Sequence, residues 1–193
     1  MTATLLNAEN SVLLVLDVQE RLAAAMDRRD EVRESSEFLA SVAGIVGVPV
    51  VVTRQYPAGL GDVEPGLAAT LTALEADGLK VARADKMAFD CFAESTFRDA
   101  VDVMNRRQLI IVGMESHICV TQTAVSALVA GWDVHVVEDG CCSRSERSHR
   151  GAMERLRAAG AVITCAESAA YELVGEAGTP RFKALLGLVK RRG

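Results

Sequence analysis

The stretch "QLIIVGMESHICVTQTAVSALVAGW", residues 108–132, decides the fold. An apolar run ends at Gly113, and after a short spacer a helical pattern continues almost without charge to residue 130. A continuous apolar strand followed by a buried helix is typical of a parallel sheet covered on both faces. The spacer carries Cys119, which at this turn could be a small core hydrophobe or a nucleophile in a cleft.

Outward from this stretch, strand-length apolar runs alternate with longer helical patterns. Strands are predicted over 11–18, 49–54, 79–84, 108–114, 133–139 and 161–165, and helices over 28–46, 64–77, 93–105, 117–130, 145–159 and 179–190. The alternation predicts an α/β protein: a three-layer α/β/α fold with a central six-stranded parallel sheet, Rossmann-like and doubly wound. We expect one domain over residues 1–193, with the irregular loop 55–66 shaping a binding mouth.

Composition excludes several functional classes. The 193 residues carry 21 Lys and Arg against 26 Asp and Glu, a net charge of −5, which argues against nucleic acid as the main partner. The N-terminal residues lack a basic leader, and no apolar run is long enough to span a membrane, so we expect a cytoplasmic protein without membrane contact.

The cysteines and glycines contain no recognised cofactor motif. The five cysteines (91, 119, 141, 142 and 165) form no disulfide framework and are interpreted as free thiols. For the adjacent pair 141 and 142, packing is favoured over a vicinal disulfide or a redox sensor. No histidines share metal-ligand spacing with a carboxylate, and no glycine-rich phosphate loop is present, so neither a metal nor a nucleotide cofactor is predicted.

Three polar side chains stand at the ends of predicted strands. In open parallel sheets, ligands bind beyond the carboxyl ends of the strands, at the point where the strand order reverses. Asp17 follows the first strand, Lys86 follows the third, and Cys119 follows the fourth. We expect Lys86 to keep Asp17 ionised and to draw a neighbouring thiol toward thiolate.

The turn around Cys119 suggests how a thiol could be activated. Ser116 is predicted to cap a helix that begins around His117, which places Cys119 in the first turn. Free amides and the positive helix end would lower the pKa of the thiol and could hold a developing oxyanion. His117 lies too close in sequence to pair with Cys119, and it is interpreted as a residue of the pocket rim. Local pattern alone leaves both roles of Cys119 open.

Taken together, these residues resemble the isochorismatase-like cysteine hydrolase superfamily over nearly the whole chain. The resemblance rests on "LLVLDVQE" with Asp17, "DKMAFDCF" with Lys86 and "LIIVGMESHICVTQTAVSALVAGWDVHVVEDGCCSRS" with Cys119. Within the superfamily, "QYPAGLG", "SHICVTQTA" and "DVHVVEDGCCSRS" are most similar to the isochorismatase domain-containing group. The ordered set of Asp, Lys and Cys at strand ends is much more specific than any one of these motifs.

The resemblance implies a catalytic arrangement. It assigns Cys119 as nucleophile, Asp17 as general base and Lys86 as electrostatic partner. It also implies a non-proline cis peptide between Met114 and Glu115, with the amides of Glu115 and Cys119 as the oxyanion hole.

Two departures from the family pattern limit which reactions we expect this chain to catalyse. Nicotinamidases of this superfamily bind a metal through an Asp-x-His motif after the second strand, where this chain has "TRQYPAGLG". Isochorismatases that cleave a vinyl ether lack the nucleophilic cysteine. We therefore predict a metal-independent, cofactor-free cysteine hydrolase that cleaves a C–N bond of a small amide- or imide-like substrate.

The remaining expectations concern the pocket, the assembly and the alternatives. The pocket residues are predicted to be Gln19, Gln55, Tyr56, Phe89 and His117. Relatives form oligomers, so a homo-oligomer is expected. The alternatives are a vinyl-ether or ester hydrolase of isochorismatase type and a non-catalytic, redox-responsive α/β protein.

Overall fold

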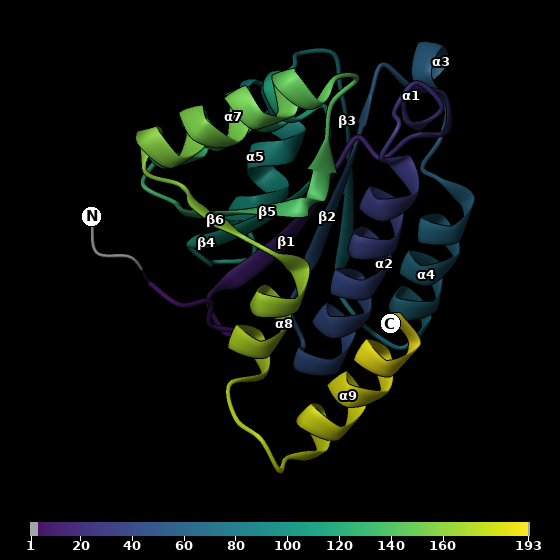
Figure 1. Ribbon diagram of the computed structural model, residues 1–193, viewed down its shortest axis with the longest axis vertical. Coiled ribbons are helices and arrows are strands. Elements are labelled where there is room, and N and C mark those ends of the chain that lie inside the picture. The colour runs from purple at the N-terminus through teal and green to yellow at the C-terminus, as the bar shows by residue number, and fades with distance from the viewer. Residues whose placement is uncertain (1–3, 193) are drawn as a thin grey trace.

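A computed structural model describes residues 4–192 and builds them around one six-stranded sheet (Figure 1). The strands are β1 (Ser11–Leu16), β2 (Val50–Gln55), β3 (Val81–Lys86), β4 (Gln108–Met114), β5 (Asp133–Cys142) and β6 (Val162–Thr164). Their order is β3-β2-β1-β4-β5-β6, and every neighbouring pair is parallel. The order reverses between β1 and β4, so the crevice for ligands is expected beyond the ends of these two strands.

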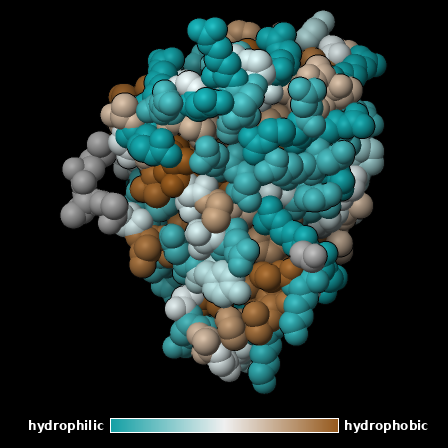
Figure 2. Space-filling model, in the orientation of Figure 1, coloured by the Kyte–Doolittle hydropathy of each residue, from teal (hydrophilic) through white to brown (hydrophobic). Residues whose placement is uncertain are grey.

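Helices cover both faces of the sheet, which confirms the predicted three-layer, doubly wound architecture. They are α1 (Glu20–Ala23), α2 (Arg29–Val46), α3 (Pro57–Leu60), α4 (Pro65–Ala76), α5 (Ser95–Asp102), α6 (Thr121–Val129), α7 (Glu146–Ala159), α8 (Ala166–Val174) and α9 (Pro180–Arg192), with the short turns η1 (Cys91–Ala93) and η2 (Ser116–Val120). Residues of α2, α4, α8 and α9 pack in one core cluster, and residues of α5, α6 and α7 in the other. Figure 2 shows that the face turned to the viewer is largely hydrophilic.

The central strands are continuous apolar runs because both of their faces are buried. In β1, Leu13 and Val15 enter one core cluster, whereas Leu14 and Leu16 enter the other. All residues of β1 and β4 are buried. Burying one such aliphatic side chain is worth roughly 1.5–3 kcal/mol, so the two strands anchor the fold and fix the edge where the site is built.

Gly113 lets β4 approach β1 closely at the reversal point. Its φ is +135°, and a Cβ at this position would lie 1.9 Å from the carbonyl oxygen of Leu16. Leu16 and Gly113 are register partners in the sheet. A side chain larger than hydrogen therefore cannot fit between the two strand ends.

The structure differs from the predicted elements at strand β5 and at several helices, among them the unpredicted helix α1. Strand β5 extends to Cys142, because a register irregularity between Ile111 and Gly113 lets the strand pair with β4 again after a break. Helix α8 was not predicted, and the loop 55–66 contains the short helix α3. Cys141 and Cys142 are both free and buried and enter opposite core clusters, as the packing interpretation predicted.

Within residues 4–192, no helix is long and apolar enough to cross a membrane.

Candidate active site

Asp17 lies at the end of β1 and is fully buried. Its backbone turns out of the sheet with a φ of +56°, in the left-handed region that aspartate tolerates better than most residues. The hydroxyl of Thr53, at the end of β2, donates to Asp17 Oδ1 at 2.7 Å. Lys86 Nζ lies 2.7 Å from Oδ2. Apart from this ion pair, Oδ2 has no hydrogen-bond donor of regular geometry among residues 4–192, so it is free to accept a proton.

Lys86 reaches Asp17 from the edge strand β3 by crossing the end of β2. Its ammonium donates to Gln55 Oε1 at 2.6 Å and, in longer contacts of 3.4 Å, to the carbonyls of Ala88 and Phe89. Burial lowers the pKa of Lys86, but the attraction of Asp17 and nearby thiols outweighs it, so the pKa is raised overall. Lys86 therefore carries a positive charge at neutral pH, as the sequence predicts.

Cys119 lies in η2, the turn that follows β4, and is 4% exposed. Its thiol is within interaction range of both Asp17 and Lys86. Burial raises the pKa of the thiol to about 12; the negative charge of Asp17 adds to this effect and Lys86 only partly opposes it. The expected lowering of this pKa was wrong, because burial and the negative charge of Asp17 outweigh the opposing effect of Lys86. Cys119 is a protonated thiol at rest and needs a base.

The turn before Cys119 is built differently from the predicted capped helix. The peptide between Met114 and Glu115 is cis, as the family resemblance implied. Residues Ser116–Val120 form a π-helical turn, and Ser116 does not cap it. Instead, the Ser116 hydroxyl hydrogen-bonds with Nδ1 of buried His149 on α7 at 2.9 Å. The first turn is thus anchored by a distant helix rather than by a local cap.

The segments that follow β4 and β5 are joined next to this turn. The carboxylate of Glu115 accepts from the backbone N–H of Arg144 at 3.2 Å and from its Nε at 3.0 Å. His117 Nδ1 hydrogen-bonds with the Ser143 hydroxyl at 2.9 Å, and its side chain is partly exposed. His117 is thus a partly exposed residue of the turn, and its role in a pocket stays a prediction.

The other predicted pocket residues have unequal positions. Gln19 is fully buried and braces the loop, donating to the carbonyls of Gln55 and Gly61 and accepting from the Gln55 N–H. Gln55 in turn holds Lys86. Tyr56 and Phe89 are about half exposed beside the buried lysine. Gln19 thus supports the site from beneath, whereas the two aromatic residues are open to a ligand.

Several residues of this network were not singled out from the sequence. Thr53 and Arg144 hold the predicted site residues Asp17 and Glu115, and His149 holds Ser116, the predicted cap. Thr53 offered one signal, a hydroxyl at the end of an apolar strand. His149 and Arg144 offered none, because their contacts depend on how α7 and β5 pack against the turn.

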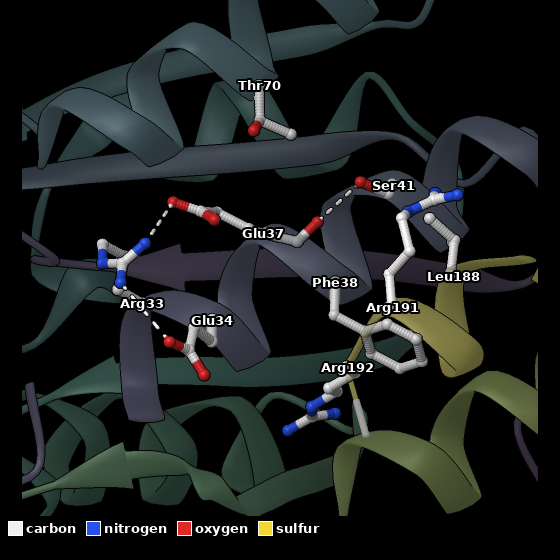
Figure 3. A pocket seen from close by; sticks show the side chains of 9 residues that line it. All are labelled: Arg33, Glu34, Glu37, Phe38, Ser41, Thr70, Leu188, Arg191 and Arg192. Atoms are coloured by element: carbon white, nitrogen blue, oxygen red, sulfur yellow. Dashed lines mark hydrogen bonds and ion pairs between the residues drawn. The ribbon is translucent and has the colours of Figure 1, made fainter. Parts of the chain in front are cut away.

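A pocket elsewhere on the surface does not involve these residues. It has a volume of about 600 Å³ and lies between α2, α4 and α9 (Figure 3). Arg33 and Glu37 form an ion pair across one of its walls, and Phe38 and Leu188 line its apolar part. For metals, the described residues contain no group of three or more His, Cys, Asp or Glu side chains that could hold an ion.

Comparison with known proteins places this arrangement in a family. A family model described as the isochorismatase domain matches residues 11–168. The secreted isochorismatase effector Isc1 of Phytophthora sojae is 37% identical over 182 residues, covering 94% of this chain and 85% of that protein. Isochorismatase domain-containing protein 2 of Bos taurus is 34% identical over 183 residues, covering 94% and 83%.

Solved structures agree with the sequence comparison. The MAR1 ribonuclease of Caenorhabditis elegans superposes with a TM-score of 0.88 at 33% identity, covering 97% of this chain and 93% of that one. YcaC of Pseudomonas aeruginosa, solved with hexane-2,5-diol and covalent acrylamide, gives a TM-score of 0.85 at 25% identity with the same coverage. From the domain match, these relatives and the shared fold, the chain belongs to the isochorismatase family of hydrolases.

Proposed function

We propose that this protein is a metal-independent cysteine hydrolase that cleaves a C–N bond of a small amide- or imide-like substrate. One observation carries the proposal: Asp17 and Lys86 form a buried ion pair of 2.7 Å at the reversal point of the sheet, where their charges influence the Cys119 thiol. Buried charges are costly, and an ion pair beside a nucleophilic atom in a crevice is typical of a catalytic site.

The first step is proton transfer from the thiol to the carboxylate. Because burial raises the pKa of Cys119 to about 12, the thiol stays protonated until a base removes its proton. Asp17 takes the proton on Oδ2, and the sulfur attacks the substrate carbonyl carbon as the C–S bond forms. Lys86 keeps its charge throughout and offsets the negative charge that develops on the sulfur.

The second step releases the amine. The carbonyl oxygen becomes an oxyanion, which we place against the backbone amides of Glu115 and Cys119. As the C–N bond breaks, Asp17 returns the proton to the leaving nitrogen, and a thioester on Cys119 remains. Water then attacks the thioester carbonyl while Asp17 accepts its proton, and the returning thiol regains that proton. Atoms and charges balance over the cycle, which consumes one water.

Two further observations support this reaction over the reactions of related enzymes. At the end of β2, where nicotinamidases carry Asp-x-His, this chain has Gln55 and Tyr56, and the Gln55 amide is engaged by Lys86. A metal-activated water therefore has no ligand set at that position. The YcaC structure contains covalent acrylamide, so a relative of this chain holds a small amide covalently.

A panel of small amides and imides, with ammonia release as the readout, tests the proposal. We expect turnover of at least one member, abolished in Cys119→Ala and in Cys119→Ser. Cys91→Ala is the matched control, because Cys91 is also a buried thiol near the same ion pair. It should retain most of the activity. A fully active Cys119→Ala enzyme contradicts the proposal.

The same panel separates the alternatives. Vinyl ethers and esters are included, and cleavage of these compounds by Cys119→Ala would point to acid catalysis by Asp17. An RNA substrate is included because one neighbour is called a ribonuclease, although a net charge of −5 gives little attraction to phosphates. No turnover of any compound in the panel, together with ready oxidation of the thiols, would favour the non-catalytic, redox-responsive role.

The expected location and assembly stay predictions. One relative is named as a secreted effector, so location needs direct measurement. Homo-oligomer formation is consistent with the exposed side chains of Tyr56, Met87 and Phe89, which give the mouth of the site an apolar rim. Light scattering of the purified protein measures the number of subunits.

A further inference from the structure

The loop that follows Lys86 is held by Glu94, a residue that is not part of the predicted site. Residues 87–90 fold back over the lysine, so that the carbonyls of Ala88 and Phe89 face its ammonium. One oxygen of Glu94, Oε1, accepts the backbone N–H groups of both Met87 and Ala88, at 3.0 and 2.9 Å. Glu94 thereby fixes the two peptide groups through which the loop leaves β3.

Glu94 occupies a position where its residue type is unusual. It is the N-cap residue of α5, a position that favours Ser, Thr, Asp or Asn, and its side chain makes no capping hydrogen bond to that helix. The carboxylate instead turns back to the loop. A residue that departs from the usual N-cap preference and makes a contact elsewhere instead is expected near a functional site.

The far end of the loop is tied to the helix that carries the nucleophile's turn. Asp90 Oδ2 accepts from the Ser126 hydroxyl on α6 at 2.6 Å, and the Cys91 N–H donates to Thr123 Oγ1 on the same helix at 3.1 Å. The loop is therefore attached at one end to Glu94 and at the other to α6. Its conformation links the lysine to the helix that follows η2.

We propose that Glu94 is a positioning residue for the reaction: by accepting the Met87 and Ala88 amides, it holds the loop whose carbonyls orient the Lys86 ammonium toward Asp17 and Cys119. Glu94 itself contacts no reacting atom. The inference rests on the proposed function only for its catalytic consequence, because the orientation of Lys86 can be measured without a substrate.

Three variants separate positioning from charge and from general stability. Glu94→Ala removes the acceptor. Glu94→Gln removes the charge but keeps an oxygen that can accept both amides. Asp99→Ala removes a carboxylate from the exposed face of the same helix and serves as the control.

The first readout is the NMR signal of the Lys86 ammonium protons, assigned by its loss in Lys86→Arg. We expect their exchange with water to be about tenfold faster in Glu94→Ala, and to stay near the wild-type rate in Glu94→Gln and Asp99→Ala. With an active substrate, Glu94→Ala should lower kcat by about 10- to 100-fold and change KM by less than about threefold.

Unchanged ammonium exchange in Glu94→Ala overturns the inference, and so does a Glu94→Gln variant as impaired as Glu94→Ala. If Glu94→Ala does not fold, Glu94→Asp takes its place, because its shorter side chain cannot reach both amides, and the same acceleration is expected. If the wild type hydrolyses no amide, the proposed function fails, while the exchange measurement still decides the role of Glu94.

Discussion

On the β1 side of the crevice, the site is held by side chains: the Thr53 hydroxyl, the Lys86 ammonium and the Gln55 amide together fix the Asp17 carboxylate. On the β4 side, Cys119 is placed by the course of the backbone, through Gly113 and a π-helical turn. Substitutions in the two halves should therefore have different effects on activity and on stability. Substitutions on the β1 side should abolish activity while the chain still folds. Substitutions on the β4 side should reduce both activity and folding stability.

The largest effect is expected at Asp17. Asp17→Asn keeps the shape of the side chain but removes the base, so kcat/KM should fall by about 10²- to 10⁴-fold. The chain should still fold, but the thermal midpoint should fall, because the buried Lys86 ammonium loses its counter-charge. Thr53→Val removes only the hydrogen bond to Oδ1 and should cost about tenfold. Near-normal turnover of Asp17→Asn would contradict this view, because the reaction would then need no base on the β1 side.

A large loss of stability is expected at Gly113. Gly113→Ala would place a methyl group 1.9 Å from the Leu16 carbonyl, so the free energy of unfolding should drop by more than about 4 kcal/mol. Gly151→Ala is the matched control: the glycine is exposed in α7 and an added methyl meets nothing within 4 Å. It should be neutral or stabilise by up to about 1 kcal/mol. Urea unfolding measures both, and equal stabilities would refute the close approach of β1 and β4.

The smallest effect concerns pH. Burial raises the pKa of Cys91 and Cys119 to about 12, above the ordinary value for a thiol in the unfolded chain. Both groups hold their protons more tightly in the folded state, so their contribution to stability is complete below about pH 8.5 and is lost as the pH rises toward 12. The free energy of unfolding should fall by roughly 1–2 kcal/mol per buried thiol by pH 10.

Denaturant unfolding at pH 7 to 10 measures this slope. Cys91→Ala should reduce it, whereas Cys165→Ala should leave it as it is, because Cys165 is exposed. A pH-independent stability over this range would show that the buried thiols ionise as easily in the folded chain as in the unfolded one.

Sequence patterns predicted the sheet, its layers and the residues at the strand ends, because burial on two faces requires continuous apolar runs and because Asp17 and Lys86 interrupt them. They did not predict how the Cys119 turn is held. The Ser116 hydroxyl pairs with His149, 33 residues away, and such a contact leaves no local trace. The direction of the Cys119 pKa was also missed, since it depends on how completely the packed structure excludes water from the thiol.

Lys86 is the last residue of β3, an edge strand whose outer side has no neighbouring strand in the sheet. An edge of this kind can pair with other chains and start aggregation unless it is short or fastened down. By reaching across β2 to Asp17, Lys86 fastens the end of β3 to the centre of the sheet. The buried ion pair thus also holds the end of the edge strand to the sheet, a contribution to the fold that is separate from any part in a reaction.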